Sequence, residues 1–160
     1  MDGSRVRGLE VALLWLSLVV GMTLHFTYDV SGIRYGVAFE APDATGVVPW
    51  SSFVLKGLFY VLPFLMAVGA LGGPGRAYRR VNLVVAVLFL LPNAAHVAGT
   101  ASAADDVLGY AQILLLGALL LANLQLVRLA RQWLSMGTPD TSAADAAPRT
   151  TGREELPAAS

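Results

Sequence analysis

The stretch VNLVVAVLFLLPNAAHVAGT, from Val81 to Thr100, decides the fold class of this chain. It contains no Asp, Glu, Lys or Arg, and a helix of about 20 residues is long enough to cross the hydrocarbon core of a bilayer. Three further apolar runs satisfy the same length rule, at about 9–27, 50–72 and 107–129. The sequence therefore predicts an all-α membrane protein, in which four transmembrane helices within residues 9–133 form an antiparallel bundle.

The composition of the chain agrees with a membrane environment. Of its 160 residues, 56% are hydrophobic and 14% are charged, whereas a soluble domain carries about 25% charged residues. The formal net charge is zero, so no overall electrostatic field favours nucleic acid as a partner. The expected partner is the lipid bilayer. Cysteine is absent, which excludes disulfides and thiol chemistry, and we expect no cofactor.

Basic residues mark one side of the four spans. The flanks on that side hold seven arginines, namely Arg5, Arg7, Arg76, Arg79, Arg80, Arg128 and Arg131. The connection after the third span carries only the acidic residues Asp105 and Asp106, and the connection after the first has a single arginine among several acidic residues. Because cytoplasmic flanks are enriched in Lys and Arg, we predict a multi-pass protein of the cell membrane with both termini cytoplasmic.

Three segments lie outside the predicted spans. Residues 1–8 form the cytoplasmic N-terminus. Residues 134–160 are rich in Thr, Ser, Asp, Pro and Ala, with little apolar bulk to bury, and are predicted to be a disordered cytoplasmic tail. The connection 30–49 alternates apolar and polar residues, which is typical either of a short hairpin or of a segment lying in the membrane interface.

Polar side chains within the spans gather toward the extracytoplasmic side. An ionisable side chain at mid-helix costs about 2.5–3.5 kcal/mol, so each one needs a partner or water. The candidate site residues on this side are His25, Asp29, Lys56, Asn93, His96 and Gln112. The inner halves offer Asn82, Asn123 and Gln125, which we expect within reach of water and lipid head groups.

One hypothesis for the outer set is purely structural. Polar side chains commonly form hydrogen bonds between membrane helices, and long basic side chains extend toward the interface. In this interpretation His25 pairs with Asp29, one helical turn later, and Lys56 extends outward.

A second hypothesis is an outward-open pocket for a small polar or anionic ligand. Lys56 would supply the charge, and Asn93, His96 and Gln112 would supply hydrogen bonds. Such a pocket is typical of a binding or transport protein.

A third hypothesis is a metal or catalytic centre that uses His25 and His96. Asp29, Asp105 or Asp106 would complete it. No His-x-x-His or His-Glu-x-x-His motif occurs, so this hypothesis requires the two histidines to meet across helices.

The octet HFTYDVSG, His25–Gly32, resembles the end of the first helix in a family of small uncharacterised prokaryotic multi-pass membrane proteins. Their pattern is His-Phe-x-Tyr-acid-x-Ser-Gly, followed by Pro-Val-Asn-Glu-Ser-x-Trp-Glu-His-x-Lys. Pro42, Trp50 and Lys56 fall in comparable order, whereas the Asn-Glu and Glu-His pairs are missing and the Trp-to-Lys spacing differs. The resemblance covers the first third of the chain and implies an integral membrane protein with an outward-facing polar end and no assigned activity.

These patterns together favour a non-enzymatic membrane protein that binds a ligand or partner through its outer half, as a homo-oligomer or as a subunit with other membrane proteins. A small transporter is an alternative, and it requires a polar path that continues past Lys56 toward the cytoplasm. A metal-dependent integral membrane enzyme is a second alternative, and it requires His25, His96 and a carboxylate to converge.

Overall fold

The computed structural model describes residues 3–36, 45–72, 75–104 and 107–136. About 92% of these residues are helical, and none of them lies in a strand. Helix α1 spans Gly3–Ser31 and continues into the short 3₁₀ turn η1, Gly32–Tyr35. The second helical run consists of α2 (Trp50–Lys56), the π-helical turn η2 (Gly57–Val61) and α3 (Leu62–Leu71). Helix α4 spans Arg76–Ala103, and α5 spans Val107–Ser135. Four helical runs in the described ranges are long and apolar enough to cross a membrane, which confirms the predicted number and type of elements.

Helices α1, α4 and α5 are longer than the apolar runs from which they were predicted, whereas the second helical run, Trp50–Leu71, matches its predicted bounds to within one residue. Helix α1 begins at Gly3 and ends at Ser31, against the predicted 9–27, and α5 reaches Ser135, against the predicted 129. Charged residues do not break a helix, so the helical hydrogen bonding of the backbone continues into the arginine-containing flanks, beyond the apolar residues. The predicted disordered tail lies, from residue 137 onward, outside the described residues, as do residues 37–44 of the connection 30–49.

A spacing of three and four residues determines which side of each long helix faces its neighbours. Helix α1 packs against α3 and α5, and α4 packs against α5. The buried positions include Val11, Trp15, Leu18, Met22 and His25 in α1, Arg79, Asn82, Ala86, Phe89 and Asn93 in α4, and Leu116, Leu119, Asn123, Leu126, Ala130 and Trp133 in α5. Alternating spacings of three and four residues make a repeat of seven, and this repeat keeps a single stripe of side chains against a partner helix. We call these stripes the seams.

Polar residues on the seams are buried, while large apolar residues elsewhere on the helices are exposed. Asn82 and Asn123 are each 0% exposed, so the expectation that water and head groups reach them is wrong. The reason is their place on the seams, because it turns them toward the neighbouring helices. Asn82 accepts a hydrogen bond from Trp15 Nε1 at 3.3 Å, and the ring of Trp15 makes an edge contact with Phe89.

Arg79 joins three chain segments at the end of the molecule where α1 begins and α5 ends. The sequence placed it among the cytoplasmic flank charges, yet it is only 3% exposed. Its guanidinium donates to the carbonyl oxygens of Trp133 and Met136, at 3.2 and 3.0 Å, and to Ser4 Oγ at 2.7 Å. The carbonyls at a helix C-terminus lack partners within the helix, so Arg79 caps α5 and ties it to α1.

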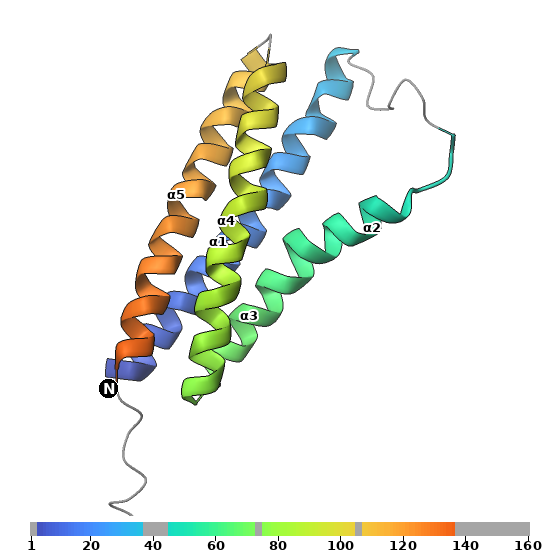
Figure 1. Cartoon of the computed structure of the whole chain (residues 1–160). Helices are drawn as coiled ribbons and strands as arrows, with labels where there is room; N and C mark the ends of the chain where they lie inside the picture. The colour runs from blue at the N-terminus through green and yellow to red at the C-terminus, as the bar shows by residue number, and fades with distance from the viewer. Residues whose placement is uncertain (1–2, 37–44, 73–74, 105–106, 137–160) are drawn as a thin grey trace, which may run out of the picture.

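Pro63 interrupts the regular helical hydrogen bonding of the segment α2–η2–α3. Proline has no N–H, so Phe59, four residues earlier, cannot receive its usual helical hydrogen bond. The Leu62 N–H bonds instead to Gly57, five residues earlier, which is the π-helical turn η2. Helix α3 stays against α1, whereas α2 contains no buried residue and leans away from the other helices (Figure 1).

Candidate functional site

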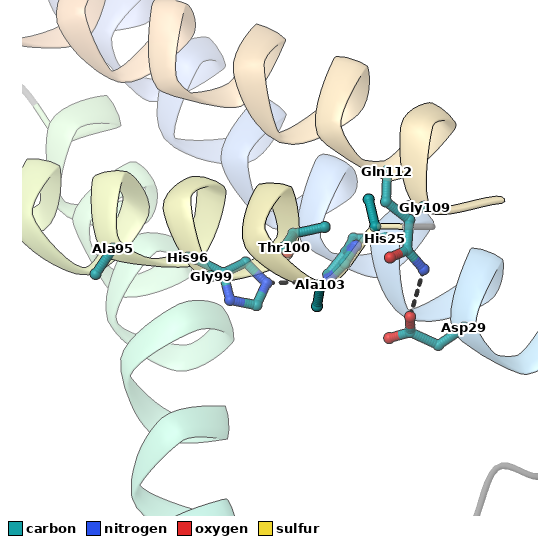
Figure 2. A pocket seen from close by; sticks show the side chains of 10 residues that line it. His25, Asp29, Ala95, His96, Gly99, Thr100, Ala103, Gly109 and Gln112 are labelled. Carbon is teal, nitrogen blue, oxygen red and sulfur yellow. Dashed lines mark hydrogen bonds between the residues drawn. The ribbon is translucent and has the colours of Figure 1, made fainter. Parts of the chain in front are cut away.

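An open cavity of about 490 Å³ lies between the C-terminal ends of α1 and α4 and the first turns of α5. The side chains of His25, Asp29, His96 and Gln112 line it, and Figure 2 shows that they come from these three helices. All four are candidates predicted from the sequence. The structure therefore brings most of the predicted outer set to one place.

The two histidines are in direct contact. Nε2 of His96 lies 2.9 Å from Nε2 of His25, and the rings meet edge to face at 86° (Figure 2). A hydrogen bond between two ring nitrogens needs one donor and one acceptor, so at least one imidazole is neutral in this arrangement. His25 pairs across the helices with His96, and not with Asp29 as the structural hypothesis proposed.

His25 is held so that one of its nitrogens has no hydrogen-bond partner among the described residues. The side chain is 8% exposed, and no described residue forms a hydrogen bond with its Nδ1. A buried polar atom without a partner costs about 1–3 kcal/mol, and native structures contain few of them. The His25 ring therefore retains a capacity to bind that the described part of the protein does not use.

Asp29 is placed by Gln112. The carboxylate Oδ1 accepts a hydrogen bond of 2.5 Å from Gln112 Nε2 (Figure 2). Asp29 follows His25 by one helical turn on α1, so both side chains lie on the same face of that helix. The bond to Gln112 holds the carboxylate at the cavity and connects α1 with α5.

The cavity exists because α4 presents small residues there. Ala95, Gly99 and Ala103 recur every four residues along one side of α4, and all three line the cavity. A Cβ added at Gly99 would meet no atom within 4 Å. In this region the small residues leave space open, whereas close helix approach occurs at Gly21, where an added Cβ would overlap the side chain of Leu119.

Two predicted site residues lie elsewhere. Lys56 is exposed on α2 and does not line the cavity, because α2 leans away from α1 and α4. Asn93 lies about one turn deeper than His96, where its Nδ2 donates to Asn123 Oδ1 at 2.8 Å. Asp105 and Asp106, the other carboxylates considered for a metal centre, lie outside the described residues.

A packed polar layer lies next to the cavity on its inner side. Asn123 accepts from Asn93 and donates to the carbonyl oxygen of Ala86 at 3.1 Å, and neither Ala86 nor Asn123 is exposed at all. Sequence reasoning missed Asn123 as a structural residue. Asn123 follows Gln112 by eleven residues, or about three helical turns, so the two side chains lie on one face of α5. This spacing is the signal in the sequence that could have predicted the burial of Asn123.

The chemistry of the cavity follows from its lining. Two imidazoles, one carboxylate and one amide are present, with the hydroxyl of Thr100, and no lysine or arginine is among the lining residues described. A carboxylate without a nearby cation attracts positive charge, so this lining suits a cation or a hydrogen-bond donor better than an anion. Among the residues described, no group of three or more His, Asp or Glu is close enough to hold a metal ion.

Comparisons with protein-family models, with curated proteins and with solved structures find no match for this chain. The function is therefore inferred from the cavity itself. The resemblance of His25–Gly32 to a membrane protein family stays a prediction.

Proposed function

We propose that this chain is an integral protein of the cell membrane, whose four long helices cross the bilayer as an antiparallel bundle with both termini in the cytoplasm. The four apolar helical runs and the arginines at one end support this topology. Further support comes from Leu13, Phe64, Leu88 and Leu121, which point outward from four different runs and are 51–68% exposed. So much exposed apolar surface is rare on a soluble monomer, whereas lipid covers it in a bilayer.

The lengths of the helices support a position of the cavity at the extracytoplasmic interface. Helices α1, α4 and α5 have 28 or 29 residues, or about 42–44 Å, which matches a bilayer with its head-group regions. His25 and His96 lie six and seven residues from the ends of their helices, so they are about 10 Å below those ends, near the edge of the hydrocarbon core. Tyr35 and Trp50, 85% and 75% exposed, fit the aromatic belt of this interface.

The function supported best is the non-enzymatic binding of a small polar or cationic ligand in this cavity. The observation that carries it is the convergence of four polar side chains from three helices on one open cavity. Ligand sites typically combine an open cavity of several hundred Å³ with a few converging polar groups. The resemblance of His25–Gly32 adds support, because that octet supplies both His25 and Asp29.

Binding is favoured over transport by the packing on the inner side of the cavity. A transporter needs a polar path that continues inward, whereas Ala86, Phe89 and Asn123 are 0–2% exposed and form a closed layer there. The expected homo-oligomer, or complex with other membrane subunits, remains a prediction.

Cysteine accessibility tests the location of the cavity, and the chain suits it because it has no cysteine of its own. Ala103→Cys places a thiol in the cavity lining, and Ser135→Cys places one at the opposite end of the bundle. In intact cells we expect a membrane-impermeant maleimide to label only the first variant, and to label both after permeabilisation. Labelling of Ser135→Cys alone would overturn the orientation, and no labelling of Ala103→Cys in either state would overturn the open cavity.

Ligand binding is tested by thermal unfolding of the purified protein in detergent with three probe classes: primary amines, zwitterionic amino acids and divalent metal chlorides. A ligand at one hundred times its Kd stabilises by about 2.7 kcal/mol, or about 5–10 °C in Tm for a domain of this size. We expect such a shift with at least one class, and its loss in Ala103→Trp, whose indole fills the cavity. Leu88→Trp, on the lipid-facing side, is the matched control and should keep the shift. If no class shifts the Tm of the wild-type protein, the proposed function is wrong.

A further inference from the structure

The two histidines have the spacing of paired metal ligands. A transition-metal ion lies about 2.0–2.1 Å from an imidazole nitrogen, so nitrogens 2.9 Å apart would subtend about 90° at a shared ion. That is the angle between neighbouring ligands in octahedral and square-planar sites. A tetrahedral angle needs a separation of about 3.3 Å, about 0.4 Å more than the observed distance.

The burial of His25 is a second and independent observation. Its ring is 8% exposed, lines the cavity, and has Nδ1 without a partner among the described residues. With Nε2 as the hydrogen-bond donor to His96, Nδ1 is an unpaired acceptor; with Nε2 as the acceptor, Nδ1 is an unpaired donor. In neither tautomer do the described residues satisfy both nitrogens, so the hydrogen bonding of the His25 ring is incomplete within the described part of the chain.

The charge and the donor types of the lining agree on one class of ligand. Asp29 supplies the one carboxylate of the described lining, and no cationic side chain of that lining opposes it. Neutral imidazole is a preferred ligand of Zn²⁺, Cu²⁺ and Ni²⁺, and a weaker one of Mg²⁺ and Ca²⁺, which prefer oxygen. An organic amine would meet one carboxylate but would not need two imidazole nitrogens so close together.

We propose that His25 and His96 together bind one divalent transition-metal ion of the Zn²⁺, Cu²⁺ and Ni²⁺ class at the outer end of the bundle. This inference rests on the proposed function and names its ligand. Each ring contributes its Nε2, and water from the open cavity fills the remaining positions of the ion. Asp29, held by Gln112, contributes negative charge in the same cavity. Binding replaces the hydrogen bond between the rings, and the proton of that bond moves to Nδ1 or to water.

The composition of the chain makes this proposal easy to test. It contains two histidines and no cysteine, so a signal from a metal-bound imidazole can come only from His25 or His96. The full-length protein, purified with a tag that contains no histidine, is titrated with Cu²⁺ and examined by electron paramagnetic resonance. Equilibrium dialysis against Zn²⁺ gives the number of ions bound and the Kd.

We expect one ion per chain and a nitrogen hyperfine pattern from two imidazoles. His25→Ala and His96→Ala should each leave the pattern of one nitrogen and weaken binding at least about 100-fold, since changing even an outer-shell group weakens metal binding about 10–100-fold. Lys56→Gln, outside the cavity, is the control and should bind as the wild type does. Metal bound with equal affinity by the double variant His25→Ala/His96→Ala, or no binding by the wild type at micromolar Zn²⁺, would overturn the proposal.

A readout on the unaltered protein covers the case in which a histidine variant fails to fold. With ¹⁵N-labelled histidine, Zn²⁺ should shift the Nε2 resonances of both rings, and unchanged resonances at saturating Zn²⁺ would also overturn the proposal. The cysteine experiment separates the two failures. If Ala103→Cys is labelled from outside while no metal binds, only the metal inference falls; if it is not labelled in either state, the open cavity falls with it.

Discussion

Asn123→Ala is expected to be among the most destabilising single changes in the interior of the bundle. Asn123 is 0% exposed, accepts a hydrogen bond from Asn93 and donates one to Ala86. An interhelical hydrogen bond in a membrane protein contributes on average about 0.6 kcal/mol, so the loss of two costs about 1.2 kcal/mol. The Asn93 amide, 5% exposed, is then left without its acceptor, which adds about 1–3 kcal/mol. The sum is about 2–4 kcal/mol.

Asn93→Ala should cost less, about 1 kcal/mol, because Asn123 keeps its bond to Ala86 and an unpaired carbonyl is tolerated better than an unpaired N–H. The two changes should therefore be non-additive. The double variant Asn93→Ala/Asn123→Ala contains neither amide, so no buried N–H is left without an acceptor. We therefore expect a coupling energy of at least about 1 kcal/mol between the two changes. In Asn93→Leu/Asn123→Leu both partners become apolar with a similar shape, and the effect should be close to neutral.

The measurement is reversible unfolding in mixed micelles by titration with sodium dodecyl sulfate, followed by far-ultraviolet circular dichroism. Folded fractions for the wild type, both single variants and the double variant close the thermodynamic cycle. Single-variant effects that add to within about 0.3 kcal/mol would mean that the two amides do not touch, and the closed layer beneath the cavity would then be wrong.

Two further predictions concern helix contacts and use the same unfolding assay. Arg79→Gln removes the cap on α5 and should destabilise the protein by about 2–4 kcal/mol, because hydrogen bonds from a charged donor contribute about 1.5–3 kcal/mol each and interfacial water replaces part of the loss. The control is the exposed Arg128, whose replacement by Gln should change the stability by no more than about 0.5 kcal/mol. Equal effects of the two changes would contradict the cap. Gly21→Ala should destabilise the protein by about 1–3 kcal/mol, because the new methyl group overlaps the side chain of Leu119. The control is Gly117→Ala, which has open space around it and should be neutral or stabilising. A neutral Gly21→Ala would show that α1 and α5 are further apart than described.

Hydropathy alone was sufficient to predict the four helices but not their inward faces. A window of apolar residues averages over the whole circumference of a helix, so it reports a span and carries no direction. The direction lies in the spacing of the polar residues: Asn82, Asn93 and His96 are separated by eleven and three residues, which puts them on one side of α4. That spacing, applied to every span, would have predicted the burial of Asn82.

The candidate site was predicted in part. His25, Asp29, His96 and Gln112 converge because each occupies the outer end of a seam, and polar residues at equal depth on neighbouring seams meet. Lys56 has a comparable depth in the sequence but lies on α2, which contains no buried residue and leans away from the other helices (Figure 1). The tilt of a helix depends on how it packs against its neighbours, and the spacing of residues does not reveal it.

The contact between the two histidines is central to the proposed site, because it joins a side chain of α1 to one of α4 at the cavity. It can be measured directly in the metal-free, full-length protein by nuclear magnetic resonance with ¹⁵N-labelled histidine. The chain has only two histidines, so a scalar coupling across the hydrogen bond can arise only between Nε2 of His25 and Nε2 of His96. We predict a correlation between these two nitrogens. Two rings with no such correlation, and with spectra unaffected by replacement of the other histidine, would contradict the convergence of the site.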